Sequence, residues 1–164
     1  GLLIGIGETW KERLETLVDI IEIHRRYGHI QEVIIQNFRA KQGTLMENSP
    51  EPSHDDMCRT LAVARLMLPA EISLQAPPNL SDNYLDYIDC GINDWGGISP
   101  LTADYINPEC AWPKIDLLKV GVGQKGYKLN ERLTIYNRFI ENSERYLEPK
   151  TAERVNFLEA NYSH

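Results

Sequence analysis

The chain has 164 residues, 42% of them hydrophobic, and a formal net charge of -7. It is long enough to bury one sizeable core, and its composition is that of an ordinary soluble globular domain. No apolar run is long enough to cross a bilayer and no signal region opens the sequence, so a cytoplasmic location is expected. The acidic balance without a Lys/Arg cluster argues against nucleic-acid and membrane partners and favours a small-molecule partner.

The cysteines and the first residues bear on how the chain is organised. Cys58, Cys90 and Cys110 are odd in number and far apart. They fit neither a disulfide framework nor a zinc or iron-sulfur spacing, and we expect free thiols. The sequence has no initial Met and opens directly on a strand-like run, which suggests a fragment of a longer chain.

The first third of the sequence predicts a strand, a helix and a second strand. Residues 2–6 form a continuous apolar run that is typical of a buried parallel strand. Thr9 and Glu12 form a capping box that opens a helix, and Gly28 ends it after Tyr27. The helix is expected to bury Trp10, Leu14, Leu17, Val18 and Ile21 and to turn Lys11, Arg13 and Glu15 outward.

The pattern then repeats. Residues 33–35 predict the second strand, and a long polar loop over 39–52 leads to Ser53, the N-cap of a helix. That helix is expected to bury Met57, Leu61, Ala64 and Leu68. A third strand at 72–76, a short helix from Ser81 to Ile88 and a fourth strand at 91–95 follow. Alternating strands and helices indicate an α/β fold with four parallel βα units joined by right-handed crossovers.

The pattern changes after Asn107. An apolar segment at 115–120 precedes a glycine-spaced turn at 121–123, and further helical or irregular structure follows. We therefore divide the chain into residues 1–107, the βα units, and residues 108–164, an extension that packs on them. Four βα units are half of an eight-stranded barrel of about 250 residues. The other half is expected to precede Gly1.

Four strand ends carry residues better suited to a ligand than to a core. Gly, Asn, Pro or charged residues cluster at 5–8, 36–39, 75–79 and 91–102. Because the carboxyl ends of parallel strands meet at one edge of a sheet, these clusters predict a single site there.

Several motifs resemble one enzyme superfamily. Residues 1–8 are similar to the G-x-I-x-G-x-x-E pattern of radical S-adenosylmethionine (SAM) enzymes, with Leu3 in the Ile place. Glu8-Thr9, Gly43-Thr44 after the Asn37 strand, and residues 60–65 resemble the second barrel half of the biotin-synthase-like branch. Residues 28–38, 75–80 and 93–100 together resemble the 7,8-didemethyl-8-hydroxy-5-deazariboflavin (FO) synthases, specifically the ring-closing subunit.

This resemblance implies the second half of a radical SAM TIM-type (β/α) barrel in a carbon-nitrogen lyase. Such an enzyme would form the deazaflavin chromophore from a hydroxybenzyl adduct of a ribitylaminouracil, releasing ammonia, methionine and 5'-deoxyadenosine. The implied cofactors are SAM and a 4Fe-4S cluster. The family's C-x-x-x-C-x-x-C motif is absent here, so its cysteines are expected upstream of Gly1 and the fragment alone is expected to be inactive. A companion FO synthase subunit and an electron donor are the implied partners.

The resemblance also assigns roles to the strand ends. The predicted cofactor-binding residues are Gly5, Ile6, Gly7, Glu8, Gln36, Asn37 and Phe38. The predicted substrate-binding residues are Gln75, Pro77, Asn79, Asn93, Asp94, Trp95, Gly96 and Gly97. No catalytic residue is assigned and none of the four histidines is expected to be a ligand. Glu8 could instead stabilise the helix N-terminus, Asp94 could cap a turn, and Arg39 and Lys41 are either carboxylate contacts or solvated.

Other functions remain open from the sequence. The companion subunit that joins the tyrosine-derived fragment to the uracil and a menaquinone-pathway relative are rivals among radical SAM enzymes. A non-catalytic half-barrel module that pairs with another chain is the rival from a different class.

Overall fold

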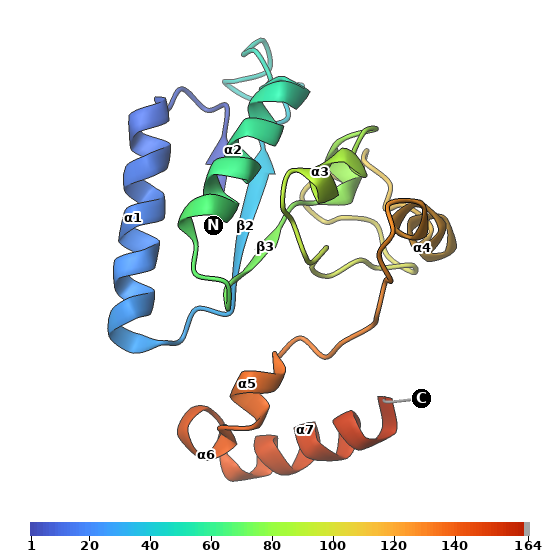
Figure 1. Ribbon diagram of the computed structural model, residues 1–164. Helices are drawn as coiled ribbons and strands as arrows, with labels where there is room; N and C mark the ends of the chain where they lie inside the picture. Colours follow the sequence, from blue (N-terminus) through green and yellow to red (C-terminus); the bar gives the residue numbers. More distant parts are fainter. Residues whose placement is uncertain (163–164) are drawn as a thin grey trace. The chain divides into compact units, whose positions relative to one another are not determined.

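The computed structural model describes residues 1–162, which form two compact units, one of residues 1–128 and one that begins at Leu129 (Figure 1). The first unit holds β1 (Leu2–Ile4), α1 (Trp10–Tyr27), β2 (Glu32–Asn37), α2 (His54–Met67), β3 (Ser73–Gln75), the 3-10 helix η1 (Pro78–Leu80), α3 (Asp86–Asp89) and α4 (Ile115–Gln124). The second holds α5 (Asn137–Ile140), α6 (Ser143–Tyr146) and α7 (Pro149–Tyr162). The predicted division after residue 107 stays a prediction.

The sheet of the first unit is parallel, in the order β1-β2-β3. Ile4 lies opposite Asn37, and Ile34 lies opposite Gln75. The predicted fourth strand is wrong for the described residues: residues 91–95 contribute a single parallel bridge, between Gln75 and Asp94. The side-chain Oδ1 of Asn93 accepts the N–H of Leu74 at 2.8 Å, so a side chain takes a place that a strand's carbonyl would fill.

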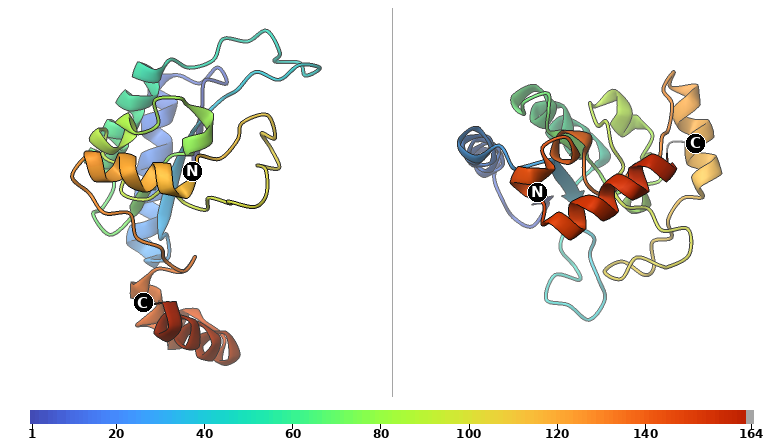
Figure 2. Two further views of the ribbon diagram at one scale, coloured as in Figure 1. Left: turned by 90° about the vertical axis from the view of Figure 1, so that its right-hand side faces the viewer. Right: turned by 90° about the horizontal axis from the view of Figure 1, so that it is seen from below.

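Helices α1 and α2 cover the same face of the sheet (Figures 1 and 2). The core between them is built from one side of each strand and one stripe of each helix. Its fully buried members include Ile4, Leu17, Ile35, Leu61 and Leu74. The capping box at Thr9, the left-handed Gly28 and the Ser53 N-cap are confirmed.

The buried stripe of α1 differs from the prediction. It consists of Arg13, Leu17, Ile21 and His24. Trp10, Leu14 and Val18, expected in the core, are 41%, 38% and 42% exposed. Arg13, expected to face outward, is 7% exposed. The helix is rotated toward the Arg13 side because carboxylates of the chain meet the guanidinium there and make its burial tolerable.

Two further expectations are corrected after β3. Ser81 does not cap a helix; it ends η1, its Oγ accepts the N–H of Asn83, and α3 begins only at Asp86. The predicted glycine turn at 121–123 lies inside α4. A Cβ on Gly121 would stand 2.5 Å from Cδ1 of Leu85, so this glycine permits close packing rather than a turn.

The second face of the sheet is more open. Leu3 and Ile34 on this face are 44% and 39% exposed, and Gln36 lies on the same side by strand alternation. Within the second unit, α5, α6 and α7 contact one another, and the rings of Phe139 and Tyr146 meet edge-on at 4.8 Å. Among the described residues, no helix combines the length and the apolar character needed to span a bilayer.

Candidate functional site

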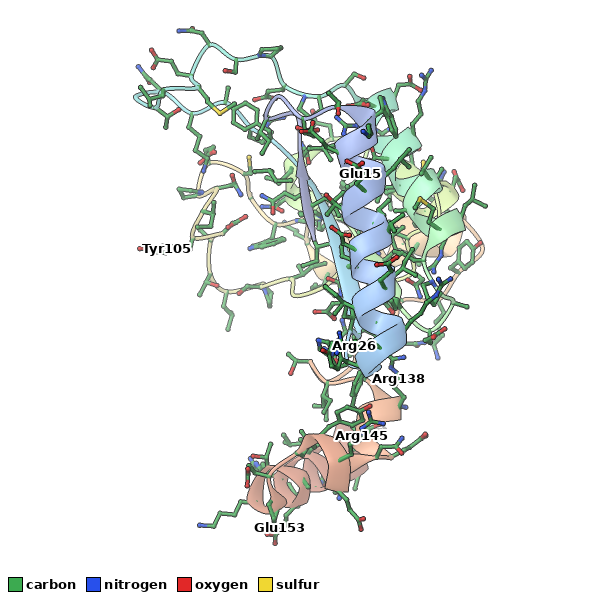
Figure 3. The ribbon with its side chains drawn as sticks, turned by 90° about the vertical axis from the view of Figure 1, so that its left-hand side faces the viewer. Glu15, Arg26, Tyr105, Arg138, Arg145 and Glu153 are labelled. Atoms are coloured by element: carbon green, nitrogen blue, oxygen red, sulfur yellow. The ribbon has the colours of Figure 1, made fainter. Side chains whose placement is uncertain are left out.

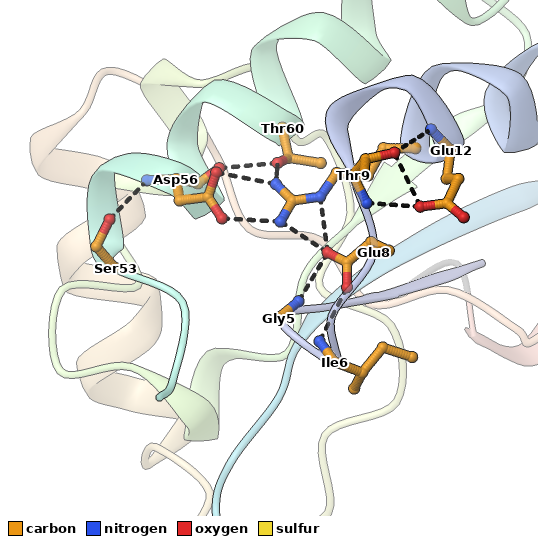
Figure 4. Close-up of polar contacts among 9 residues, drawn as sticks. Gly5, Ile6, Glu8, Thr9, Glu12, Ser53, Asp56 and Thr60 are labelled. Carbon is orange, nitrogen blue, oxygen red and sulfur yellow. Dashed lines mark hydrogen bonds and ion pairs between the residues drawn. The ribbon is translucent and has the colours of Figure 1, made fainter. Parts of the chain in front are cut away.

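The turn between β1 and α1 is built around the Glu8 carboxylate (Figure 4). Its two oxygens accept the backbone N–H groups of Gly5 and Ile6 at 2.8 and 2.9 Å. Oε1 also lies 2.7 Å from Nη2 of Arg13. Burial acts to raise the pKa of Glu8, but these hydrogen bonds outweigh it and hold the pKa below its ordinary value. The carboxylate therefore stabilises the turn by accepting hydrogen bonds from its backbone.

Arg13 joins this turn to α2. Its Nη1 and Nη2 donate to the two carboxylate oxygens of Asp56 at 2.9 Å each, and Nη1 also donates to Thr60 Oγ1 at 2.9 Å (Figure 4). Burial acts to lower the pKa of Arg13, but Asp56 and Glu8 raise it above the ordinary value. One buried cation thus fixes β1, α1 and α2 relative to one another.

The end of β2 places its predicted cofactor residues on different sides. Gln36 is on the open face, whereas Asn37 is 7% exposed and its Nδ2 donates to the carbonyl of Leu80 at 3.2 Å. Successive strand residues point to opposite faces, so the two amides cannot line one surface of the sheet. Phe38 N donates to the carbonyl of Ile4 at 2.8 Å, which joins the ends of β1 and β2.

The two cations after β2, Arg39 and Lys41, form ion pairs and hydrogen bonds with other residues of the chain. Nη1 of Arg39 lies 3.2 Å from Glu51, inside the loop over 39–52. Lys41 Nζ donates to the carbonyl of Ile106 and lies 3.7 Å from Glu109. Lys41 therefore connects the loop after β2 with the loop over 97–113, and both project from the same side of the unit (Figure 2).

The segment after α3 is tied to β3 by side chains. Nε2 of Gln75 donates to Oδ1 of Asp94 at 3.2 Å, and the same oxygen accepts the N–H of Gly96 at 2.6 Å. Asp94 therefore caps the turn that follows it, as the sequence left open. The ring of Trp95 meets Tyr84 edge-on at 5.8 Å and packs against the core.

Another polar cluster joins η1 to the loop over 97–113. Nδ2 of Asn79 donates to Oδ2 of Asp104 at 2.9 Å and to the carbonyl of Cys110 at 3.2 Å. A cavity of about 460 Å³ opens in this loop, lined by Gly97 among others. Asp104 is a site residue that the sequence did not indicate, since its partner Asn79 lies 25 positions away and its neighbours, Ala103 and Tyr105, form no polar pattern with it.

The structure brings the predicted residues into three clusters rather than one. The first surrounds Glu8, the second joins Gln75 to Asp94 and Gly96, and the third contains Asn79 and the cavity at Gly97. Pro77 lies between the second and third, as the residue before η1. Asn93 is an exposed residue whose side chain completes the edge of β3.

Within residues 1–162, thiols and histidines do not gather into a metal-binding group. Cys58, Cys90 and Cys110 are free, and the described residues hold no group of three or more His, Cys, Asp or Glu side chains that could bind a metal ion. Burial and a hydrogen bond with Cys90 raise the pKa of Cys58 to about 12. His24 packs within the first unit, as expected, while His164 lies outside the described residues.

Comparison with known proteins gives the chain its relatives. It is 53% identical over 142 residues to the 7,8-didemethyl-8-hydroxy-5-deazariboflavin synthase of Methanopyrus kandleri, covering 85% of this chain and 42% of that protein. It is 49% identical over 159 residues to the synthase of Methanothermobacter thermautotrophicus, covering 96% of this chain and 48% of that protein. The FO synthase of Streptomyces avermitilis is 49% identical over 96% of this chain and 18% of that protein.

No family model and no solved structure matches the chain. It spans about half the length of the archaeal relatives described above. The similarity nevertheless extends over nearly all of this sequence. Over that length, the chain is a homologue of the 7,8-didemethyl-8-hydroxy-5-deazariboflavin synthases.

Proposed function

We propose that this chain is part of a radical SAM carbon-nitrogen lyase that closes the deazaflavin ring. The reaction would convert the hydroxybenzyl adduct of a ribitylaminouracil into the 8-hydroxy-5-deazaflavin chromophore and release ammonia, methionine and 5'-deoxyadenosine. The observation that carries the proposal is the identity of 49% over 96% of this chain to a protein named for that product. The proposed setting is the cytoplasm, with a companion FO synthase subunit and an electron donor as partners.

The residues at the ends of β1 and β2 fit a bound SAM. The space around the Cβ position of Gly7 is open, and Ile6 is 48% exposed. Gln36 on the open face offers both a donor and an acceptor for an adenine edge. Gly5 has a different use: its φ is 90° and a Cβ would stand 2.5 Å from Pro52. In this proposal Ile6, Gly7 and Gln36 contact the cofactor, and Glu8 holds the turn that presents them.

The described residues do not fit a 4Fe-4S cluster, because they bring no three thiolates together. The proposal therefore requires cluster ligands that these residues do not supply. Bound SAM would supply radical chemistry. The contribution of this chain is to bind and orient the cofactor and the substrate and to limit the access of water to them.

The experiment uses the complete protein that carries this segment, reconstituted anaerobically with iron and sulfide and supplied with SAM, reductant and the adduct. We expect 5'-deoxyadenosine and a fluorescent deazaflavin. Gln36→Leu is expected to weaken SAM binding by about tenfold through the lost amide hydrogen bonds. Gln124→Leu, the same change at an exposed position of α4, is the matched control and is expected to change nothing.

Three results would count against the proposal. A protein that holds its cluster yet forms neither product from this adduct would exclude the ring-closing activity. Equal SAM affinity in Gln36→Leu and Gln124→Leu would remove the open end of β2 from the cofactor site. Formation of the adduct itself from tyrosine and the ribitylaminouracil would favour the companion-subunit alternative.

A further inference from the structure

The cavity in the loop over 97–113 is shallow and open, and polar side chains stand among a mostly apolar lining. Its lining includes Ser99, Thr102, Asp104 and Trp112. Tyr105 also borders it but is 95% exposed, and its side chain extends outward from the loop (Figure 3). The volume of about 460 Å³ suits one part of a small molecule better than a macromolecule. The groups that could bind such a molecule are the hydroxyls of Ser99 and Thr102, the carboxylate of Asp104 and the indole of Trp112.

Asp104 is fixed in place as an anion. Its Oδ2 accepts Nδ2 of Asn79 at 2.9 Å and Nδ2 of Asn107 at 3.1 Å, and its Oδ1 accepts the N–H of Ile106 at 2.9 Å. Burial acts to raise the pKa of Asp104, but these donors lower it. Among the described residues no cation forms an ion pair with it, so the carboxylate keeps acceptor capacity for neutral donors.

Asn79 fixes the position of Asp104. Both partners of its Nδ2, the Asp104 carboxylate and the carbonyl of Cys110, are acceptors, so the amide cannot be reversed without losing both bonds. This orientation leaves Oδ1 buried, and no donor among residues 1–162 reaches it. Asn79 does not itself line the cavity, so its contribution is to hold the Asp104 carboxylate in place.

Ser99 supplies the complementary donor. Its Oγ accepts the N–H of Thr102 at 3.0 Å, the hydroxyl of Thr102 at 2.7 Å and the N–H of Leu101 at 3.3 Å. With its oxygen engaged as an acceptor, the hydroxyl proton of Ser99 is left to donate. The loop thus presents a carboxylate acceptor and a hydroxyl donor, a pair that matches neighbouring hydroxyl groups, each of which both donates and accepts.

We propose that this pocket, the polyol pocket, binds a run of vicinal hydroxyl groups through Asp104 and Ser99, beside the indole of Trp112. The inference rests on the proposed function, because the ribityl chain of the substrate is the expected source of those hydroxyls. The ribose of SAM carries the same chemistry and is the second source. Asp104 and Ser99 would then determine specificity for the hydroxylated chain without taking part in the radical step.

The test measures direct binding to the complete, reconstituted protein by titration calorimetry. The probes are the ribityl adduct, the same adduct with a butyl group in place of the ribityl chain, and SAM. Asp104→Asn keeps the side-chain size but turns an acceptor into a donor toward Asn79. We expect it to weaken binding of the ribityl adduct by about tenfold or more and binding of the butyl adduct by less than about twofold. Asp116→Asn, at an exposed position of α4, is the matched control.

Ser99→Ala is the milder second variant, should Asp104→Asn fold poorly. It should weaken ribityl binding selectively by a few fold. Weakened SAM binding with unchanged adduct binding would support the polyol pocket with the ribose as its occupant. Equal losses for the ribityl and butyl adducts, or no loss for any probe, would overturn the proposal. If the wild-type protein binds the ribityl adduct but forms no deazaflavin, the proposed function fails while the polyol pocket can still be tested.

Discussion

Two carboxylates in the first unit are held by similar hydrogen bonds but differ in whether they can accept a further hydrogen bond from a ligand. Glu8 and Asp104 both accept backbone N–H groups and side-chain donors, and both have pKa values below the ordinary ones. Glu8 also meets the buried cation Arg13, at 2.7 Å. Asp104 is held by neutral amides beside a cavity. A carboxylate paired with a buried cation stabilises the fold and is not available to a ligand. A carboxylate held by neutral amides can still accept a ligand's hydrogen bond.

The largest effect should come from removing the cation of the Glu8 cluster. Arg13→Met keeps most of the aliphatic volume but leaves Glu8 and Asp56 without their shared partner. We expect a loss of about 3 kcal/mol in the free energy of unfolding, at the lower end for a broken buried ion pair because both carboxylates are partly exposed. Thermal unfolding followed by circular dichroism measures it.

Arg59→Met is the matched control for that change. Arg59 lies on α2 and pairs with Asp55, with both side chains 70% exposed. Exposed pairs of this kind contribute little, so the loss should stay below about 0.5 kcal/mol. Similar losses in the two variants would mean that Arg13 does not hold the turn, and the contrast between the Glu8 and Asp104 clusters would disappear.

A smaller effect separates the two glycines of the same turn. Gly5 and Gly7 have φ values of 90° and 110°, so alanine is strained at both. At Gly5 the new Cβ would also stand 2.5 Å from Cδ of Pro52, whereas at Gly7 it meets nothing within 4 Å. We expect Gly5→Ala to cost roughly 2–3 kcal/mol and Gly7→Ala about 1–2 kcal/mol. Equal costs in thermal unfolding would contradict the close contact with Pro52.

Local sequence signals predicted much of the fold. The Thr9 capping box, the Gly28 cap and three of the strands follow from neighbouring residues, and all are present. The burial of the Arg13 side chain could not be predicted from neighbouring residues. Its partner Asp56 lies 43 positions away, and charge alone places an arginine on the outside. The predicted fourth strand is absent from the described residues 91–95 because backbone pairing beside β3 is limited to the Asn93 N–H, which donates to the carbonyl of Leu74, and one bridge at Asp94, while the Asn93 side chain accepts the N–H of Leu74.

The candidate site was predictable in composition but not in arrangement. Polar residues do stand at the strand ends, but Gln36 and Asn37 point to opposite faces of the sheet, and the Glu8 carboxylate is bonded to the backbone of its own turn. Asp104 gained significance only when the fold brought it to Asn79. Long-range partners decide which polar side chains are already satisfied, and sequence spacing does not reveal them.

The smallest effect we predict is on acid stability. A carboxylate whose pKa is lowered in the folded state contributes stability that is complete above its ordinary pKa and is lost as the pH falls through the lowered value. The ordinary values are 4.5 for Glu8 and 3.8 for Asp104, so on acidification the Glu8 contribution should begin to decline first. Glu8→Gln and Asp104→Asn should each remove about 1 kcal/mol or less of the pH-dependent free energy of unfolding, so the unfolding temperature should fall less steeply below those pH values. The clusters share no partner, so the double variant should show the sum of the two effects. The unfolding temperature of the double variant could instead fall with acid as steeply as that of the wild type. In that case neither carboxylate is held by its cluster as described. The contrast between Glu8, which is paired with a buried cation, and Asp104, which can still accept a ligand's hydrogen bond, would then have no energetic basis.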